Sequence, residues 1–202
     1  MSALYIARHQ ETEANREELV LGASDSPLTD EGRKGALQLS RMLRGRGIAL
    51  IISSPLRRAE ATARVIAEIC GAPFSIDGDY GELSCGSWEG RPRREILPAG
   101  GPLRSAWADA PPGGESFEDA AGRIARVLER ALFYRKRHTV LMVGHGAANQ
   151  LLLALFMGLD RDPHRFPLQP SSLVYFFEGF SPLKAKWLDA GGASGEGLVV
   201  PQ

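Results

Sequence analysis

Two histidines follow runs of apolar residues that are typical of buried strands. Arg8 and His9 come directly after the apolar run 4–7, and His145 comes directly after the run 139–144. In an open parallel sheet, ligands bind outside the carboxyl ends of the strands. We therefore expect both histidines to lie at one edge of the sheet, where their side chains can act on the same ligand.

An arginine at the start of a helix adds to this group. Arg58 follows a third apolar run, residues 48–54, and a proline that is typical of a first helical turn. A guanidinium group binds two oxygens of a phosphate at once, and helix N-termini favour anions. Taken singly, Arg58 is expected on a solvated helix face and His145 in a satisfied core position. Together with Arg8 and His9, they predict a pocket for a tetrahedral anion.

The residue types in this pocket suit phosphoryl transfer. An imidazole with one unprotonated nitrogen is a good nucleophile near neutral pH. Donors around the phosphate stabilise charge in the transition state, which is most of what phosphoryl transfer requires. Two arginines and two histidines supply these donors, and the chain has no HExxH or CxxC pattern. We therefore predict neither a metal site nor a cofactor.

The elements that must position these residues alternate between strand and helix. Apolar runs of strand type are separated by stretches with a helical period, and Thr29 can cap the first helix. This alternation predicts an α/β three-layer sandwich, with a mostly parallel central sheet and helices on both faces. The expected strands are 3–7, 48–54, 139–144 and 172–178, and the expected helices are 30–44, 56–69, 117–135 and 147–157.

The middle and the end of the chain differ from the rest. Residues 77–115 are rich in Gly, Pro and Arg, and we expect them to form a small lid insertion. A single domain is expected over residues 1–190, and the Gly-rich stretch 191–202 is expected to be a flexible tail. The run 172–178 either pairs between subunits of a homodimer or is covered within the chain, and the sequence leaves both alternatives open.

Composition excludes several kinds of partner. The 202 residues contain 24 Lys plus Arg and 24 Asp plus Glu, so no whole-protein field favours nucleic acid or an anionic membrane. The longest apolar run, residues 151–157, is too short to span a bilayer. The two cysteines do not form a disulfide framework, so we expect free thiols in a reducing compartment and a cytoplasmic location.

Six motifs follow one another along the chain, from residue 4 to about residue 157. They are ARHQETEAN, DSPLTDEG, SSPLRRAEATA, GELSCGSWEG, PGGES and VLMVGHG. In this order they resemble the histidine phosphatase superfamily, also called the phosphoglycerate mutase-like family. The chain has about the size of the small phosphatases of that family, whose mutases are usually longer. The resemblance implies a hydrolase that cleaves a small-molecule phosphate ester through a phosphohistidine.

The resemblance also implies a role for each matched residue. His9 is the expected nucleophile, and Arg8, Arg58 and His145 are the expected phosphate-binding groups. Glu82 is the expected general acid, which protonates the leaving oxygen. Because an alkoxide is a poor leaving group, a positioned acid accelerates its departure by roughly 10²–10⁴-fold.

Further positions match the phosphate or substrate site. Asn15 corresponds to an asparagine that adds a hydrogen bond to the phosphate, and Gly146 follows the second histidine. Gln10 departs from the Arg-His-Gly tripeptide that is usual in the family. Glycine leaves space beside the phosphate, whereas Gln10 could crowd that space, add a donor or change the turn. Glu89, in the WEG element, is expected to be structural or associated with the lid.

Two other functions stay open at this stage. A phosphoglycerate mutase would share the nucleophile but retain the phosphoryl group against water. A non-catalytic phospho-ligand binding domain would use the same pocket without turnover, and Gln10 is its only direct support. The arginines of the lid, Arg91, Arg93 and Arg94, either bind a second anionic group on the substrate or belong to a solvated charged turn.

Overall fold

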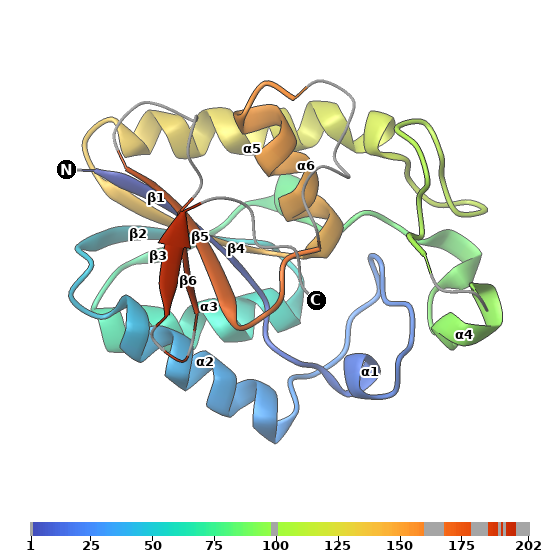
Figure 1. Ribbon diagram of the computed structural model, residues 1–202, viewed down its shortest axis with the longest axis horizontal. Helices are drawn as coiled ribbons and strands as arrows, with labels where there is room; N and C mark the ends of the chain where they lie inside the picture. Colours follow the sequence, from blue (N-terminus) through green and yellow to red (C-terminus); the bar gives the residue numbers. More distant parts are fainter. Residues whose placement is uncertain are drawn as a thin grey trace.

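A seven-stranded sheet lies between two pairs of helices (Figure 1) in the computed structural model, which describes residues 2–97, 101–159, 168–178, 186–189, 191 and 193–196. The helices are α1 (Glu13–Arg16), α2 (Asp30–Leu43), α3 (Arg57–Cys70), α4 (Arg93–Ile96), α5 (Phe117–Arg135) and α6 (Gly146–Phe156). The strands are β1 (Ala3–Arg8), β2 (Ile48–Ser53), β3 (Phe74–Ile76), β4 (Thr139–Gly144), β5 (Leu173–Glu178), β6 (Lys186–Asp189) and β7 (Ser194–Glu196). Two 3-10 turns, η1 (Gly78–Tyr80) and η2 (Gly86–Trp88), precede α4.

Parallel pairing in the centre of the sheet brings the two histidine-bearing strands together. The strand order is β3-β2-β4-β1-β5-β6-β7. β3, β2, β4 and β1 pair with one another in parallel, and Arg8 at the end of β1 lies opposite Gly144 at the end of β4. β5, β6 and β7 continue the sheet in antiparallel pairs. The expected α/β fold with a mostly parallel core is confirmed, and β1 and β4 end at the same edge.

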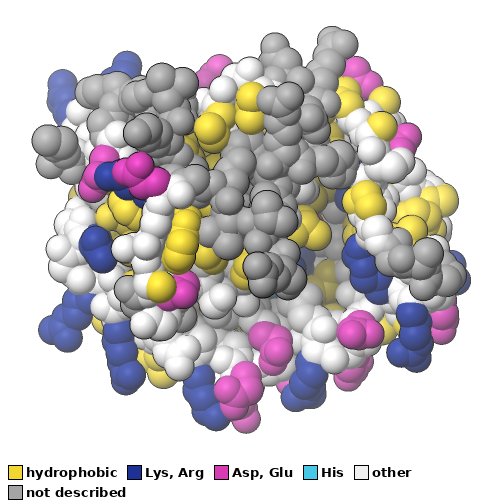
Figure 2. Space-filling model, in the orientation of Figure 1, with side chains coloured by type: hydrophobic (Ala, Val, Ile, Leu, Met, Phe, Trp, Pro, Cys, Tyr) yellow, Lys and Arg dark blue, Asp and Glu magenta, His cyan; other side chains and the backbone are white. Residues whose placement is uncertain are grey.

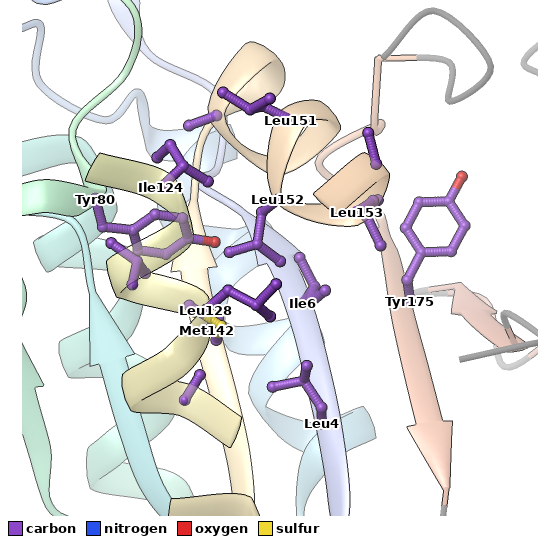
Figure 3. Close-up of a cluster of buried hydrophobic side chains, with 14 of the residues drawn as sticks. Leu4, Ile6, Tyr80, Ile124, Leu128, Met142, Leu151, Leu152, Leu153 and Tyr175 are labelled. Atoms are coloured by element: carbon purple, nitrogen blue, oxygen red, sulfur yellow. The ribbon is translucent and has the colours of Figure 1, made fainter. Parts of the chain in front are cut away.

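Alternating side chains divide β1 between two hydrophobic cores. Leu4 and Ile6 pack in one core with Leu128 of α5 and Leu152 of α6 (Figure 3). Tyr5 points to the opposite face, where the second core contains residues of α2 and α3. A strand with both faces covered requires this period of two with apolar residues throughout. The helices therefore cover both faces of the sheet, as the sequence predicts.

Helix boundaries follow the sequence signals at their ends. The hydroxyl oxygen of Thr29 accepts the N–H of Gly32 at 2.8 Å at the start of α2, and Ser116 and Asp119 form a capping box at the start of α5. Gly71 ends α3 with a left-handed conformation at φ 65°. Among the described helices, none is long and apolar enough to cross a membrane.

Several short elements differ from the sequence expectations. α1, β3 and β6 are not among the elements expected from the sequence, because three or four residues are too few to show a period. β7 lies within the expected tail 191–202. In β7, Gly195 pairs with Trp187 of β6 and leaves room for its ring, since a Cβ at 195 would lie 2.8 Å from Cζ2 of that ring. Residues 197–202 of the expected tail lie outside the described residues.

The run 172–178 has a defined place in the sheet. β5 pairs with β1 on one side and with β6 on the other. Of the two alternatives that the sequence left open for this run, coverage within the chain is therefore the one observed. Pairing of this strand with a second subunit would require β6 to leave it.

The expected lid segment, residues 77–115, begins after β3 and is tied to α5. The guanidinium of Arg130 donates to Asp77 at 2.7 Å and to Asp79 at 2.8 Å. Arg126 donates to Asp79 at 3.0 Å. These bonds hold η1 against the helix and thereby position the chain directly before the expected general acid.

Substitution of Asp79 tests this anchor. Hydrogen bonds from Arg126 and Arg130 lower the pKa of Asp79 from 3.8 to about 2. Because the pKa is lower in the folded state, the stabilisation is present above about pH 4 and is lost as the pH falls toward about 2. Asp79→Asn is expected to lower the free energy of unfolding in urea by roughly 0.5–1 kcal/mol at neutral pH, and by progressively less below about pH 4. An equal loss across this pH range would contradict a role for the charge.

Candidate active site

The ends of β1 and β4 bring the two expected histidines together. The N–H of His9 donates to the carbonyl of Gly144 at 2.9 Å, which extends the pairing of the two strands by one residue. The ring centroids of His9 and His145 lie 5.2 Å apart, and both side chains are buried. The sheet thus places the two imidazoles side by side, as the sequence predicts.

His9 is held as a neutral imidazole with one defined tautomer. Its Nδ1 lies 2.7 Å from the carbonyl oxygen of Gln10. Because a carbonyl oxygen only accepts, Nδ1 carries the hydrogen and Nε2 is unprotonated. Burial lowers the pKa of His9 well below 6.5, and the charges of Arg8 and Arg58 lower it further. A neutral imidazole with an unprotonated Nε2 can act as a nucleophile at neutral pH.

His145 contacts Ser54 through one ring nitrogen. Its Nε2 lies 2.6 Å from the hydroxyl oxygen of Ser54, which also accepts the N–H of Leu56 at 3.2 Å. Within the described residues, Nδ1 of His145 has no hydrogen-bond partner. Burial lowers the pKa of His145 well below 6.5, with further contributions from His9 and the nearby arginines. When the Ser54 hydroxyl donates to Nε2, Nδ1 carries the hydrogen and can donate to an anion.

Arg8 and Arg58 bring two guanidinium groups to the same site. Arg8 donates through Nη1 to the carbonyl of Gln169 at 3.1 Å, and Arg58 donates to the carbonyls of Ser24 at 2.6 Å and Gly22 at 2.8 Å. In the part of the chain that the structure describes, Nε of each arginine has no hydrogen-bond partner. Burial lowers the pKa of both groups, although both stay charged at neutral pH. Buried N–H groups without a partner are rare, so these nitrogens suit an anionic ligand.

Glu82 is bound at the first turn of α6. Its carboxylate oxygens accept the N–H of Ala147 at 3.1 Å and the N–H of Ala148 at 2.9 Å. Gly146, the first residue of α6, lies beside both Glu82 and Arg8. A Cβ at position 146 would be 3.7 Å from Oε2 of Glu82 and 3.7 Å from Cζ of Arg8. The carboxyl group of Glu82 and the guanidinium of Arg8 therefore lie on either side of Gly146, and glycine at this position keeps the space between them open.

Asn15, the expected additional donor to the phosphate, lies at the site. It lines the same cavity as Arg8 and His9. Its Oδ1 accepts the N–H of Thr12 at 3.3 Å within the capping box of α1. The carbonyl half of the amide therefore holds the helix, and the NH₂ half is the part that can donate to a ligand.

Gln10 points away from the site, unlike the sequence expectation. Its Nε2 donates to the carbonyl of Ser171 at 2.6 Å, and its main-chain N–H donates to the hydroxyl of Thr62 at 3.1 Å. Its Oε1 lies against α2, where a Cβ on Gly35 would come within 2.4 Å of it. These contacts satisfy a buried amide, and Gln10 does not line the cavity formed by the described residues. Gln10 therefore gives no support to a non-catalytic binding domain.

Glu89 holds together two loops around Arg58. Its carboxylate accepts the N–H groups of Ala23 at 2.9 Å, Ser24 at 2.9 Å and Cys85 at 2.8 Å. Burial raises the pKa of Glu89, but hydrogen bonds from Ser24 and the main-chain N–H groups outweigh this effect and leave the pKa below its ordinary value. This arrangement agrees with the structural role expected for Glu89, because one of these loops also supplies the carbonyls that bind Arg58.

Asn149 joins β1 to the segment directly before Glu82, a role not predicted from the sequence. Its Nδ2 donates to the carbonyl of Ala7 at 3.0 Å and to Oε1 of Gln169 at 2.9 Å. Its Oδ1 accepts the hydroxyl of Tyr80 at 2.6 Å, and burial raises the pKa of Tyr80, so the hydroxyl keeps its proton. A lone asparagine within an apolar helix is the sequence signal that could have indicated this network.

Six of the expected site residues line one cavity of about 510 Å³, whereas Gln10 and the fully buried His145 are not among the described residues that line it. Its wall contains Arg8, His9, Arg58 and Glu82, together with aliphatic side chains and further arginines. Among the described residues, no group of three or more His, Cys, Asp or Glu is arranged to hold a metal ion. A neutral imidazole beside unpaired cationic donors and a carboxyl group can transfer a phosphoryl group.

Comparisons with known proteins agree with this geometry. A family model described as "Histidine phosphatase superfamily (branch 1)" matches residues 4–177. The "Probable phosphoglycerate mutase GpmB" of Salmonella newport is 34% identical over 164 residues, which cover 79% of this chain and 76% of that protein. A mycobacterial glucosyl-3-phosphoglycerate phosphatase, solved with VO₃, has a TM-score of 0.81 at 26% identity and covers 89% of this chain and 92% of its own. The alpha-ribazole phosphatase of Shigella flexneri has a TM-score of 0.75 at 27% identity and covers 91% and 93%.

Asn149→Leu tests whether the Asn149 network stabilises the site. Loss of the amide leaves the Tyr80 hydroxyl and the Ala7 carbonyl without this partner, at a cost of about 1–3 kcal/mol for each buried group. We expect the free energy of unfolding in urea to fall by about 2–4 kcal/mol. Tyr80→Phe removes one hydroxyl and should lower it by about 1 kcal/mol. If Asn149→Leu unfolds with the same midpoint urea concentration as the wild type, the stabilising role of Asn149 is wrong.

Proposed function

Because this chain belongs to branch 1 of the histidine phosphatase superfamily, we propose that it is a phosphomonoesterase that uses His9 as its nucleophile and needs no metal ion. Its substrate is a small phosphorylated metabolite. One observation carries this proposal: the neutral imidazole of His9 lies beside the unpaired nitrogens of Arg8, Arg58 and His145.

In the first step, Nε2 of His9 attacks the phosphorus atom of the ester. A nitrogen–phosphorus bond forms, the bond from phosphorus to the ester oxygen breaks, and the carboxyl group of Glu82 gives its proton to the leaving oxygen. The hydrogen on Nδ1 stays bonded to the Gln10 carbonyl, which stabilises the positive charge that develops on the ring. The alcohol leaves and the phosphoryl group stays on His9.

In the second step, water attacks the phosphohistidine. Glu82, now a carboxylate, takes a proton from the water as the new oxygen–phosphorus bond forms and the nitrogen–phosphorus bond breaks. Inorganic phosphate leaves, and His9 returns to its neutral form. One carboxyl group thus serves as the acid of the first step and the base of the second.

The cationic side chains act on the phosphoryl oxygens in both steps. Arg8 and Arg58 contribute fixed positive charge, and His145 and Asn15 contribute neutral donors. Arg8, Arg58 and His145 are buried or largely so, where electrostatic interactions are stronger than in water. Their positions are set before the substrate binds, so little reorganisation is required in the transition state.

A phosphoglycerate mutase is the second candidate, because relatives that are 34% identical bear that name. A mutase would form the same phosphohistidine and return the phosphoryl group to a hydroxyl of the substrate instead of to water. Structural neighbours that are named phosphatases favour hydrolysis. With 3-phosphoglycerate, isomerisation without release of inorganic phosphate would replace the hydrolase proposal with the mutase.

His9→Ala tests the nucleophile. We expect hydrolysis of 4-nitrophenyl phosphate to fall by more than about 10³-fold, because the covalent route is lost. His138→Ala, which changes an exposed histidine, is the matched control and should keep wild-type activity. Wild-type activity should persist in excess EDTA, because arginine side chains supply the charge. Hydrolysis that survives in His9→Ala, or that EDTA abolishes, would refute the proposal.

Glu82→Gln tests the general acid by comparing two leaving groups. For an alkyl phosphate, whose alkoxide needs a proton, kcat/KM should fall by roughly 10²–10⁴-fold. For 4-nitrophenyl phosphate the loss in kcat/KM should be much smaller, since nitrophenolate leaves without protonation. An equal loss with both esters would instead assign Glu82 to substrate binding.

A further inference from the structure

The cavity that contains the nucleophile extends well beyond a phosphate group. Its volume of about 510 Å³ lies in the range of sites that enclose a whole small molecule. Among the described residues, seven Leu and Val side chains line it, and we call them the apolar wall: residues 19–21, Leu83, Leu97, Leu103 and Leu168. An ester that fills this cavity therefore contacts hydrocarbon over much of its alcohol part.

Main-chain hydrogen bonds join the two sides of the apolar wall. The N–H of Val20 donates to the carbonyl of Arg91 at 3.0 Å, and the N–H of Gly90 donates to the carbonyl of Val20 at 2.8 Å. The N–H of Arg93 donates to the carbonyl of Glu18 at 2.9 Å. Figure 1 accordingly shows α1 and α4 at the same end of the molecule. The lid segment is thus bound to the loop after α1, and both contribute to one surface.

Arginine side chains of the lid also line the cavity. Arg104 is used within the fold, since it donates to two main-chain carbonyls of the segment 84–115, and Arg93 donates to the carbonyl of Gly101. Arg94 is exposed, and within the described residues no hydrogen bond or ion pair holds its guanidinium. On the face seen in Figure 2, Lys or Arg side chains lie next to hydrophobic ones at the right-hand end, where Figure 1 places α4.

The described lining of the cavity has more positive than negative charge, even when the hydrogen bonds within the lining are taken into account. Of the described residues that line it, five are arginines and two, Glu18 and Glu82, are acidic. The carboxylate of Glu82 is bound by main-chain N–H groups of α6, and Glu18 is exposed and makes no ion pair with the described arginines. Arg8 and Arg58 are the partners of the transferred phosphoryl group. Among the described arginines of the cavity, Arg94 is therefore the one left for a second part of the substrate.

We propose that the substrate is a phosphomonoester whose alcohol part is apolar and ends in a second anionic group, which Arg94 binds. This inference rests on the proposed phosphatase activity. An alcohol part rich in hydroxyls would lose hydrogen bonds to water against the apolar wall. A hydrocarbon chain or ring gains by leaving water, and a distal carboxylate or phosphate gains a guanidinium partner.

Matched esters of primary alcohols test both parts of this proposal. The first pair is hexyl phosphate and 2-propoxyethyl phosphate, an ether ester of the same chain length in which one methylene group is replaced by oxygen. The second pair is 6-phosphonooxyhexanoate and 6-phosphonooxyhexanamide. We expect kcat/KM to be about 10-fold or more higher for the hydrocarbon chain of the first pair. We expect it to be about 10-fold higher for the acid of the second pair.

Variants of the lid identify the residues responsible. Leu103→Gln is expected to remove the preference for hexyl phosphate, whereas Leu37→Gln, on the exposed surface of α2, keeps it. Arg94→Gln is expected to lower the ratio of acid to amide from about 10 to about 1. Arg91→Gln removes the same charge from the same segment outside the cavity and is expected to keep the ratio.

Hydrolysis of 4-nitrophenyl phosphate separates two kinds of failure. If neither this activated ester nor any alkyl ester is hydrolysed, the proposed phosphatase activity itself is wrong. If the activated ester is hydrolysed but the matched esters show equal kcat/KM, or none at all, the substrate class is wrong and the phosphatase stands. If Arg94→Gln still prefers 6-phosphonooxyhexanoate to 6-phosphonooxyhexanamide, the proposed role of Arg94 is wrong.

Discussion

Two guanidinium groups and two imidazoles, buried together at one edge of the sheet, are the constraint on which the rest of the structure depends. Buried charge is costly unless hydrogen bonds and opposite charges compensate for it. The loop 22–24 supplies carbonyls, Gln169 supplies another, and the carboxylates of Asp25 and Glu82 lie nearby. The same positive charges help to keep His9 neutral. A bound phosphoryl group would supply further negative charge. It would thereby compensate for the same buried positive charges that favour its binding.

Polar side chains then join distant segments around this edge. Glu89 links the loop 22–24 to the lid, and Ser54 links the end of β2 to the second histidine. Asn149 links β1 to η1, so that one buried amide connects the strand that precedes His9 to the segment that precedes Glu82. Each link replaces local flexibility with specific hydrogen bonds. The site is therefore held in its geometry by contacts that lie outside the reacting groups themselves.

The central sheet and the meeting of His9 with His145 could be predicted, because strand periodicity and strand ends are local features of the sequence. Helix ends could be predicted for the same reason, through caps such as Thr29. The direction of Gln10 could not, since its partner Ser171 is 161 residues away. The contact of Asn149 with β1 spans 142 residues and was also missed. The sequence thus contains the residue types of the site, whereas long-range hydrogen bonds decide which of them face the ligand.

Direct detection of a phosphoryl group on His9 tests the central claim. The Glu82→Gln enzyme is mixed with 4-nitrophenyl phosphate, because the first step needs little acid with this ester while the second step lacks its base. The reaction is quenched in alkali, digested, and the phosphorylated peptide is mapped by mass spectrometry. The account predicts a burst of nitrophenol that matches phosphate on the peptide containing His9. The claim is wrong if nitrophenol is released while the peptide that contains His9 stays unmodified at every time point. It is also wrong if the phosphate is found on another residue.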